Sequence, residues 1–559
     1  MTQRSLWIQV GLLFAVLYLA LLGARPMITP DEPRYGAMAQ EMLASGDWFT
    51  LRMVGFTYYE KPPLGTWLMA ASMSCLGHNA FAIRLPGALA ALVSALAAGM
   101  IARRIAARAE AGPLAAMVQL TTTLPMALAT VAILDPVFTA FVSLTLALFL
   151  EGSERQGRSR AVWLLLSGGA AGAAFLTKGF LAFAMPAVAA GSFLLWERRW
   201  RDLALLPWLP MAGAAAVAGP VAWLLHRANP GFWEYFVLVE HVRRFANPDD
   251  NQHSEPWWLL TVVTVVGGLF WMLLWPRACR SAPGTDPSRR AWRFAICCVV
   301  PPLLLLSLSK GKLPTYVLPL FPAISALVTA GLLRWRTGRP ASRDGGTWVV
   351  ECVTMFLAAS AMVLSATGLQ RWGLPPLWTG GERMNLLLAG LALLTWSLLE
   401  TRAHRAGNAV SWLARTAWVP VPALMLVHLL LPTALLAAPK APWTLLDRHA
   451  EALRTSARVA SINSMAHAVS WVARRHDLAV FEPRSEFDNE LGLEHEQSRF
   501  VRLADFLPVL DAWTAQGSVT LVLDTDYSGV VARRLGDRIA ARSTDRGVTI
   551  FEIPGPALP

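Results

Sequence analysis

The feature that most constrains this chain is a series of long apolar stretches separated by short polar connections. Up to about residue 437, about thirteen stretches hold roughly 17–22 apolar residues each, enough to cross a hydrocarbon core ~30 Å thick. These stretches are 6–23, 81–101, 113–130, 132–150, 161–177, 179–196, 203–225, 257–275, 292–309, 314–333, 347–366, 383–399 and 417–437. With 55% hydrophobic and only 15% charged residues among 559, the chain is not a cytosolic enzyme. It is predicted to be a bundle of membrane-spanning helices.

Arginine clusters occupy every second connection between these stretches, for example at 103–108, 155–160 and 198–201. Because Lys and Arg near span ends are retained in the cytoplasm, we expect these connections to be cytoplasmic. The N-terminus is then cytoplasmic and the C-terminus external, with the first stretch interpreted as an anchor and not as a cleaved signal peptide. The net charge of +12 fits such loops. A nucleic-acid binder is not indicated, since no basic stretch is interleaved with aromatic residues.

Two regions depart from the pattern of spans. The first external connection, 24–80, is long. It contains a predicted helix that Asp31 caps, that carries Pro33 in its first turn and that ends near Gly46. We expect this helix to be amphipathic and to lie along the membrane surface, with Met38, Met42 and Leu43 opposite Arg34, Gln40 and Glu41. A second interfacial or re-entrant helix is predicted over 64–76.

The tail, from about 440 to 559, is polar and has β-rich runs at 478–481, 519–523 and 548–553 between helical patterns. It is predicted to be a small soluble α/β domain on the external side. Residues 1–437 then form the transmembrane catalytic domain. The 5 cysteines show neither a disulfide framework nor the spacing of metal ligands.

Charged groups at the ends of membrane helices are candidates for function because burying them near lipid is costly. Six external strings contain such groups: 31–35, 58–62, 134–136, 177–180, 240–245 and 310–316. All six fall on the same side, although other loops set the topology, so the sequence predicts one site at the external face. Several cations with carboxylates and tyrosines suit a substrate that is anionic near its lipid end, such as a lipid-linked phosphate.

Each string also has a structural interpretation. Asp31 and Asp135 can cap helices, Glu60 and Lys61 can form a weak surface ion pair, His241 can be a solvated histidine, and Lys310 and Lys312 can be interfacial anchors. Lys178 has no such role, because a short turn at a membrane surface does not require a lysine.

These strings, together with the Glu41–Trp48 stretch, resemble the bacterial aminoarabinose transferase family in order and approximate spacing. Members of this family modify lipid A and are related to the protein O-mannosyltransferases. The resemblance covers about 25–335; beyond it only the plan of further spans and an external tail is shared.

The resemblance implies a GT-C type fold, an all-α membrane bundle with its active site at the periplasmic face of the bacterial inner membrane. It implies transfer of 4-amino-4-deoxy-L-arabinose from undecaprenyl phosphate to a lipid A phosphate, with inversion at the sugar carbon and resistance to polymyxin and other cationic peptides. Asp31 is the usual candidate for the catalytic carboxylate. Lipid A, the undecaprenyl-linked sugar and membrane lipids are the expected partners.

Roles follow for the other candidates. Glu60 and Asp135 join Asp31 as catalytic carboxylates. Phosphate binding falls first to Lys61, with Arg34, Lys178, Arg243, Arg244, Lys310 and Lys312 as further cations and Tyr58, Tyr59 and Tyr316 as hydrogen-bond donors. No cofactor is required by the sequence; a divalent metal at Glu60 and His241 is a weaker alternative.

Other functions stay open. A related transferase can use another sugar or a protein acceptor, and a serine or threonine acceptor would require a true general base. A transporter of lipid-linked sugars would show internal repeats and broken helices near the midplane, which the sequence does not indicate.

Overall fold

The computed structural model describes residues 1–243, 255–279, 286–309, 311–337, 407–429, 442–481, 499–502, 506–545 and 547–555, with isolated positions between 353 and 403. The chain divides into two compact units, which are described separately. Unit 1 comprises Met1–Ala24, Arg84–Leu224 and Phe236–Leu431, and unit 2 comprises Arg25–Ile83, Leu225–Tyr235 and Pro432–Pro559. Of the predicted span 347–366 only Val353 is described, and most of the predicted span 383–399 also lies outside the described residues.

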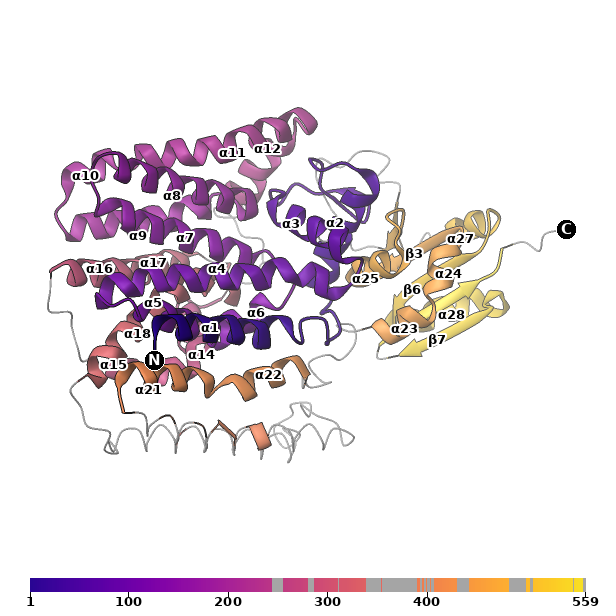
Figure 1. Cartoon of the computed structure of the whole chain (residues 1–559). Coiled ribbons are helices and arrows are strands. Elements are labelled where there is room, and N and C mark those ends of the chain that lie inside the picture. Colours follow the sequence, from indigo (N-terminus) through magenta and orange to yellow (C-terminus); the bar gives the residue numbers. More distant parts are fainter. Residues whose placement is uncertain are drawn as a thin grey trace. The chain divides into compact units, whose positions relative to one another are not determined.

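Unit 1 is built from helices (Figure 1). In chain order they are α1 (Gln3–Phe14), η1 (Ala15–Leu19), α4 (Ala80–Ala106), α5 (Ala111–Leu120), α6 (Thr123–Ala129), α7 (Asp135–Ser153), α8 (Gly157–Lys178), α9 (Leu181–Trp196), α10 (Trp200–Leu205), α11 (Trp208–Ala228), η2 (Tyr235–Arg243), α14 (Leu259–Leu273), α15 (Trp275–Cys279), α16 (Asp286–Cys297), α17 (Val300–Leu308), η3 (Pro314–Leu320), α18 (Phe321–Arg336), α21 (Ala409–Trp418) and α22 (Val421–Leu429). The first turn of α4 and most of the last turn of α11 belong to unit 2.

The number of membrane spans is not confirmed. Within the described residues, 7 helical segments are long and apolar enough to cross a membrane. Several other predicted spans correspond to shorter apolar helices. The predicted span 113–130 is wrong as a single helix, because α5 ends at Leu120 and α6 begins at Thr123. At the break, the hydroxyls of Thr121 and Thr122 donate to the carbonyls of Met117 and Val118 at 2.8 and 2.7 Å.

Small residues let α8 and α11 pack closely. A Cβ added at Gly168 would lie 1.9 Å from the Pro210 carbonyl oxygen, and one at Gly213 would lie 2.2 Å from that of Leu165. Glycine at these positions therefore permits direct backbone contact, the usual device where lipid supplies no hydrophobic drive between helices.

Unit 2 combines the first long connection with the tail. Its elements are α2 (Asp31–Ser45), β1 (Arg52–Met53), β2 (Phe56–Thr57), α3 (Leu64–Leu76), α12 (Phe232–Glu234), α23 (Trp443–Arg448), α24 (Ala450–Thr455), β3 (Arg458–Ile462), α25 (Asn463–Ala473), β4 (Ala479–Phe481), β5 (Phe500–Val501), α27 (Phe506–Thr514), β6 (Val519–Asp524), α28 (Thr525–Leu535), η8 (Gly536–Arg538), β7 (Ala541–Asp545) and β8 (Val548–Ile553). The predicted helix over 64–76 and the three predicted β runs of the tail are confirmed.

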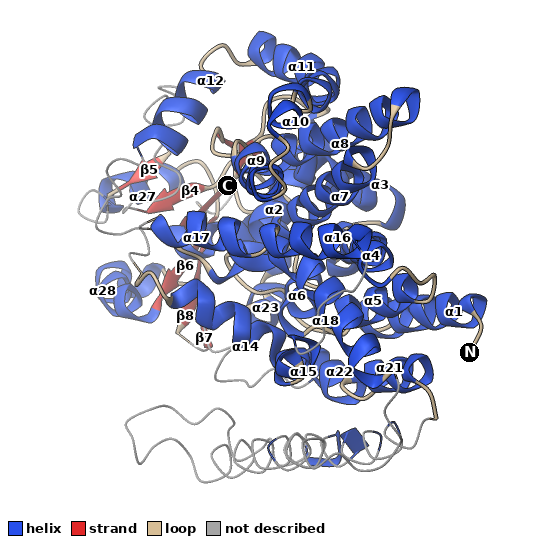
Figure 2. Cartoon of the chain, turned by 90° about the vertical axis from the view of Figure 1, so that its left-hand side faces the viewer, coloured by secondary structure: helices blue, strands red, loops and turns tan. Residues whose placement is uncertain are grey.

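The tail strands form a six-stranded sheet in the order β5-β4-β3-β6-β8-β7, drawn in red in Figure 2. The pairs from β5 to β6 are parallel, whereas β8 runs antiparallel to both β6 and β7. Helix α25 begins directly after β3 and connects it to β4, as a parallel crossover requires. Its buried residues include Met465, Ala466, Val469 and Trp471.

Helix α2 differs from its predicted form. It ends as expected, with Gly46 at φ 71° after Ser45. Met38 and Met42 are buried as predicted, but Glu41 is also buried and Leu43 is 36% exposed, so the predicted faces are wrong at these two residues. The cause is that α2 packs against both α3 and α25 of the tail, so more than one of its faces is buried (Figure 1). Its placement along the membrane surface stays a prediction. Glu41 Oε2 accepts a bond of 2.9 Å from Gly55 N, and burial raises the pKa of this carboxyl against the lowering effect of that bond.

Candidate active site

The two carboxylates that begin α2 have different environments. Pro30 and not Asp31 occupies the N-cap position, and no side chain bonds to the end of the helix, so the predicted capping role of Asp31 is wrong. Asp31 is exposed. Its neighbour Glu32 is fully buried, and its Oε2 accepts bonds from Ile28 N at 2.8 Å and from Arg25 Nη1 at 3.3 Å. Glu32 therefore anchors the start of the helix, and Asp31 is the exposed carboxylate of the pair.

Arg34 lies one turn after Asp31, among acidic and phenolic groups. Burial alone would lower the pKa of its guanidinium, but Tyr35, Tyr58, Asp31 and Glu60 raise it above the ordinary value. Tyr58 donates a bond of 3.4 Å to Glu60 Oε2. The predicted strings 31–35 and 58–62 thus meet in unit 2, where Arg34 is a permanently charged cation beside the candidate carboxylates.

Two further predicted residues belong to this cluster. Lys61 is half-buried, and its Nζ donates a bond of 3.1 Å to the carbonyl of Glu60. Tyr59 packs against Tyr235 and Phe232, with ring centroids 6.1 and 6.0 Å away. No sequence pattern singles out Tyr235 or Phe232, which follow α11 and lie far from Tyr59 in the chain.

In unit 1 the strings 134–136, 177–180 and 310–316 come together. Lys178, the last residue of α8, lies 2.5 Å from the carboxylate of Asp135, the first residue of α7, and both side chains are 14% exposed. Its ammonium group also lies 5.1 Å from the centre of the Tyr316 ring. Leu134 and not Asp135 is the N-cap of α7, so the carboxylate of Asp135 pairs with a cation and does not cap the helix.

Lys312 is the other described lysine of unit 1. Its side chain is buried, with 4% of the residue exposed, and its Nζ donates a bond of 2.8 Å to the carbonyl of Glu255. No carboxylate pairs with it among the residues that the structure describes. A buried ammonium group with only a neutral acceptor favours an anionic ligand.

Four predicted site residues fall outside what can be described. Lys310 and Arg244 are not among the described residues. For His241 and Arg243, at the end of η2, the structure describes the backbone but not the side chain. The possible metal at Glu60 and His241 therefore stays a prediction. Elsewhere in the described ranges, no group of three or more His, Cys, Asp and Glu side chains could hold a metal ion.

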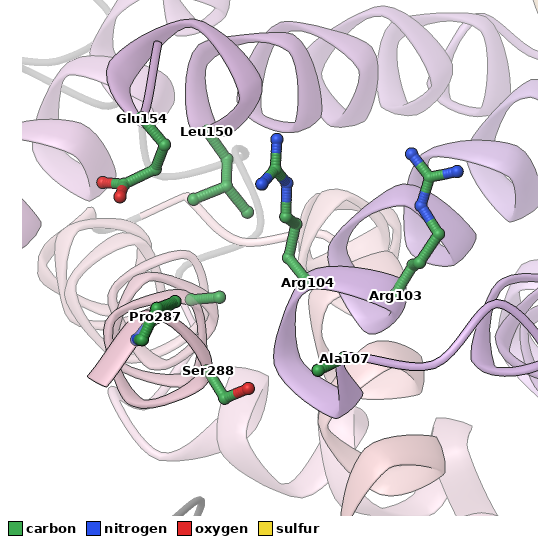
Figure 3. A pocket seen from close by; sticks show the side chains of 8 residues that line it. Arg103, Arg104, Ala107, Leu150, Glu154, Pro287 and Ser288 are labelled. Atoms are coloured by element: carbon green, nitrogen blue, oxygen red, sulfur yellow. The ribbon is translucent and has the colours of Figure 1, made fainter. Parts of the chain in front are cut away.

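A cavity of 740 Å³ opens near the C-terminal end of α7 (Figure 3). Arg103 and Arg104 line it from α4, Leu150 and Glu154 from the end of α7, and Ser288 from α16. Arg104 pairs with Glu151. Since Leu150 lies 15 residues after Asp135 on α7, about 22 Å along the helix axis, this cavity is separate from the predicted site.

Two family models match the chain. Residues 7–236 match the model of the dolichyl-phosphate-mannose-protein mannosyltransferases, and residues 437–548 match the C-terminal domain of the arabinosyl transferase ArnT. A relative from Erwinia tasmaniensis, named undecaprenyl phosphate-α-4-amino-4-deoxy-L-arabinose arabinosyl transferase, is 32% identical over 92% of each chain. A relative of the same name from Pseudomonas savastanoi is 33% identical over 94% of this chain and 95% of its own.

The fold is also similar to that of a solved structure. ArnT from Cupriavidus metallidurans, bound to undecaprenyl phosphate, superposes with a TM-score of 0.80 over 100% of both chains at 22% identity. Its apo form gives a TM-score of 0.78. The likeness extends through the membrane helices and the tail, so the two chains share one architecture.

Proposed function

Because this chain belongs to the family of undecaprenyl phosphate-α-4-amino-4-deoxy-L-arabinose arabinosyl transferases, we propose that its acceptor is a phosphate of lipid A at the periplasmic face of the inner membrane. The chain is a multi-pass membrane glycosyltransferase that takes aminoarabinose from undecaprenyl phosphate. The observation that carries this function is 32% identity over 92% of both chains. Transfer to lipid A would lower the negative charge of the envelope and protect against polymyxin and other cationic peptides.

The reaction breaks the bond between the anomeric carbon and the phosphate oxygen of the carrier and forms a bond to an acceptor oxygen. A phosphate monoester, with a second pKa of ~6, is already largely ionised at neutral pH and needs little help from a base. We therefore assign Asp31 to hold the acceptor or the sugar amino group, or to stabilise positive charge at the anomeric carbon. Its exposure at the start of α2, beside the buried Glu32, supports this assignment.

The departing carrier phosphate needs cations. Lys61 and Arg34 supply them in unit 2, and Lys312 and Lys178 in unit 1, with Tyr316 beside Lys178. Arg243, Arg244 and Lys310 keep the same proposed role. Lys312 is supported most directly, because its buried charge has a carbonyl and no carboxylate as partner among the described residues.

Mass spectrometry of lipid A from cells with and without this protein tests the function. A mass increase of one aminopentose unit that depends on the protein is expected. Unmodified lipid A together with glycosylated envelope proteins would instead favour a protein acceptor, as in the mannosyltransferase relatives. Accumulation of the lipid-linked sugar on one side of the membrane, without transfer, would indicate a transporter.

The site assignment has its own test. Asp31→Asn and Lys61→Ala should each abolish the lipid A modification while the protein stays in the membrane at the parent level. Modification at the parent level in either variant would refute that residue's role.

A further inference from the structure

The tail packs along α2, the helix that carries Asp31 and Arg34. Trp471 of α25 lies against Gly36 of α2 and is only 6% exposed. A Cβ added at Gly36 would lie 2.8 Å from Trp471 Cζ3 and 2.9 Å from Cε3. Only glycine at position 36 therefore lets the indole ring lie directly on the helix backbone.

The indole also has a stacking partner. His78, just after α3, stacks on Trp471 with ring centroids 3.6 Å apart and an angle of 23° between the planes. His78 Nε2 also bonds to Gln40 Oε1 of α2 at 2.7 Å, and Gln40 Nε2 donates to the carbonyl of Ser470 at 3.3 Å. Because the ring contacts both His78 and Gly36, it cannot move away from α2 without losing these contacts.

The tail also holds the chain before and after α2. Trp443 Nε1 donates a bond of 2.6 Å to the carbonyl of Met27, four residues before the helix begins. Arg499 Nη2 donates to the carbonyl of Val54 at 2.7 Å and to that of Leu478 at 2.6 Å. It thus connects the β1–β2 hairpin, which follows α2, to the tail sheet.

One turn before Trp471, on the same face of α25, His467 is fully buried near Arg34. Burial and then the charge of Arg34 hold the pKa of His467 well below its ordinary value. Its imidazole is neutral at physiological pH, so it packs beside Arg34 without adding a second positive charge.

We propose that the tail is a positioning element for catalysis, in which Trp471 sets the placement of α2 and, through it, of Asp31 and Arg34. This rests on the proposed function, because it takes the start of α2 as part of the active site. Trp471 does not touch the reacting atoms in this role. It acts by fixing the helix that carries them.

A double-mutant cycle in the full-length enzyme tests this role. Gly36→Ala inserts a methyl group against the indole and should lower kcat by about 10- to 100-fold, since a misplacement of about 1 Å can have that effect. KM for the lipid-linked sugar should stay at the parent value. In a Trp471→Ala background the same methyl group meets no ring, so Gly36→Ala should cause no further loss.

Trp471→Ala alone should also lower kcat, and Trp471→Phe should restore most of it because an aromatic ring again fills the space. Trp513→Ala is the matched control, since Trp513 lies on α27, which packs on β6 of the same sheet. It should leave kcat unchanged.

The positioning role would be overturned by losses from Gly36→Ala and Trp471→Ala that multiply, by an equal loss in Trp513→Ala, or by losses that only follow the amount of folded protein. Asp31→Asn, measured in parallel, distinguishes a failure of the positioning role from a failure of the proposed function. An active Asp31→Asn enzyme with intact coupling between positions 36 and 471 would reject the assignment of Asp31 alone. Parent kcat in both tail-contact variants with an inactive Asp31→Asn enzyme would reject the positioning role alone.

Discussion

Replacing Asp135 by asparagine separates two roles of this carboxylate, direct participation in the reaction and orientation of Lys178. Asp135 Oδ1 lies 2.5 Å from Lys178 Nζ, and both side chains are 14% exposed. At an effective dielectric constant of about 20, this separation gives an attraction of about 6–7 kcal/mol. Most of it offsets the removal of the two charges from water, which leaves about 1.5–3 kcal/mol for a hydrogen bond between charged groups.

If Asp135 acts by orienting Lys178, Asp135→Asn can lose no more than this amount, which corresponds to about a 10- to 150-fold decrease in kcat/KM. The assay uses purified enzyme in proteoliposomes with the undecaprenyl phosphate-linked sugar and lipid A, and modified lipid A is quantified by mass spectrometry. Lys178→Met should cause a similar loss, and the double variant should be no worse than Lys178→Met. Losses that multiply in the double variant would show that Asp135 acts independently, and the orienting role would be wrong.

Lys312→Met should raise KM for the lipid-linked sugar, because it removes a buried charge that only a carbonyl satisfies among the described residues. A parent KM in this variant would contradict a role of Lys312 in binding phosphate. Burial lowers the pKa of His78 to about 4, so the folded protein binds fewer protons than the unfolded chain between that value and about 6.5. Thermal stability should therefore fall as the pH drops through this window, and His78→Gln should flatten the fall in a thermal melt. Gly168→Ala should abolish folded protein in detergent, since the added Cβ would lie 1.9 Å from a carbonyl oxygen. Gly219→Ala is the control and should behave as the parent, because no atom lies within 4 Å of its added Cβ. Size-exclusion chromatography measures the folded protein in both variants.

Local patterns in the sequence were sufficient for several elements. The helix over 64–76 follows from its apolar run after two prolines, and the end of α2 follows from Gly46, which adopts the left-handed conformation that closes the helix. The faces of α2 could not be predicted in this way. Glu41 is buried because the hairpin amide of Gly55 bonds to it and Trp471, more than 400 residues away in the chain, packs on the same helix.

Hydropathy likewise indicates where apolar residues occur but not where a helix is interrupted. The stretch 113–130 is apolar throughout, yet its helix is interrupted at Thr121 and Thr122, whose hydroxyls donate to backbone carbonyls. In α14 the backbone leaves helical geometry at Leu269, after two glycines. Both interruptions depend on side-chain and backbone geometry that average hydropathy does not contain.

The external lysines were predicted as one group that faces phosphate, but their partners divide them. The charge of Lys178 is already balanced by Asp135, so a phosphate bound there must either displace a carboxylate or share the lysine with it. Lys312 donates to a carbonyl, which leaves its positive charge uncompensated among the described residues. An anion gains more from the second environment, because the desolvation of the lysine has already occurred on folding and no carboxylate pairs with it among the residues that the structure describes. We therefore infer that Lys312 contributes mainly to the affinity for the carrier phosphate. Lys178, held at the end of α8 by Asp135 and beside Tyr316, is better suited to a fixed geometry that contributes when negative charge develops on the leaving phosphate.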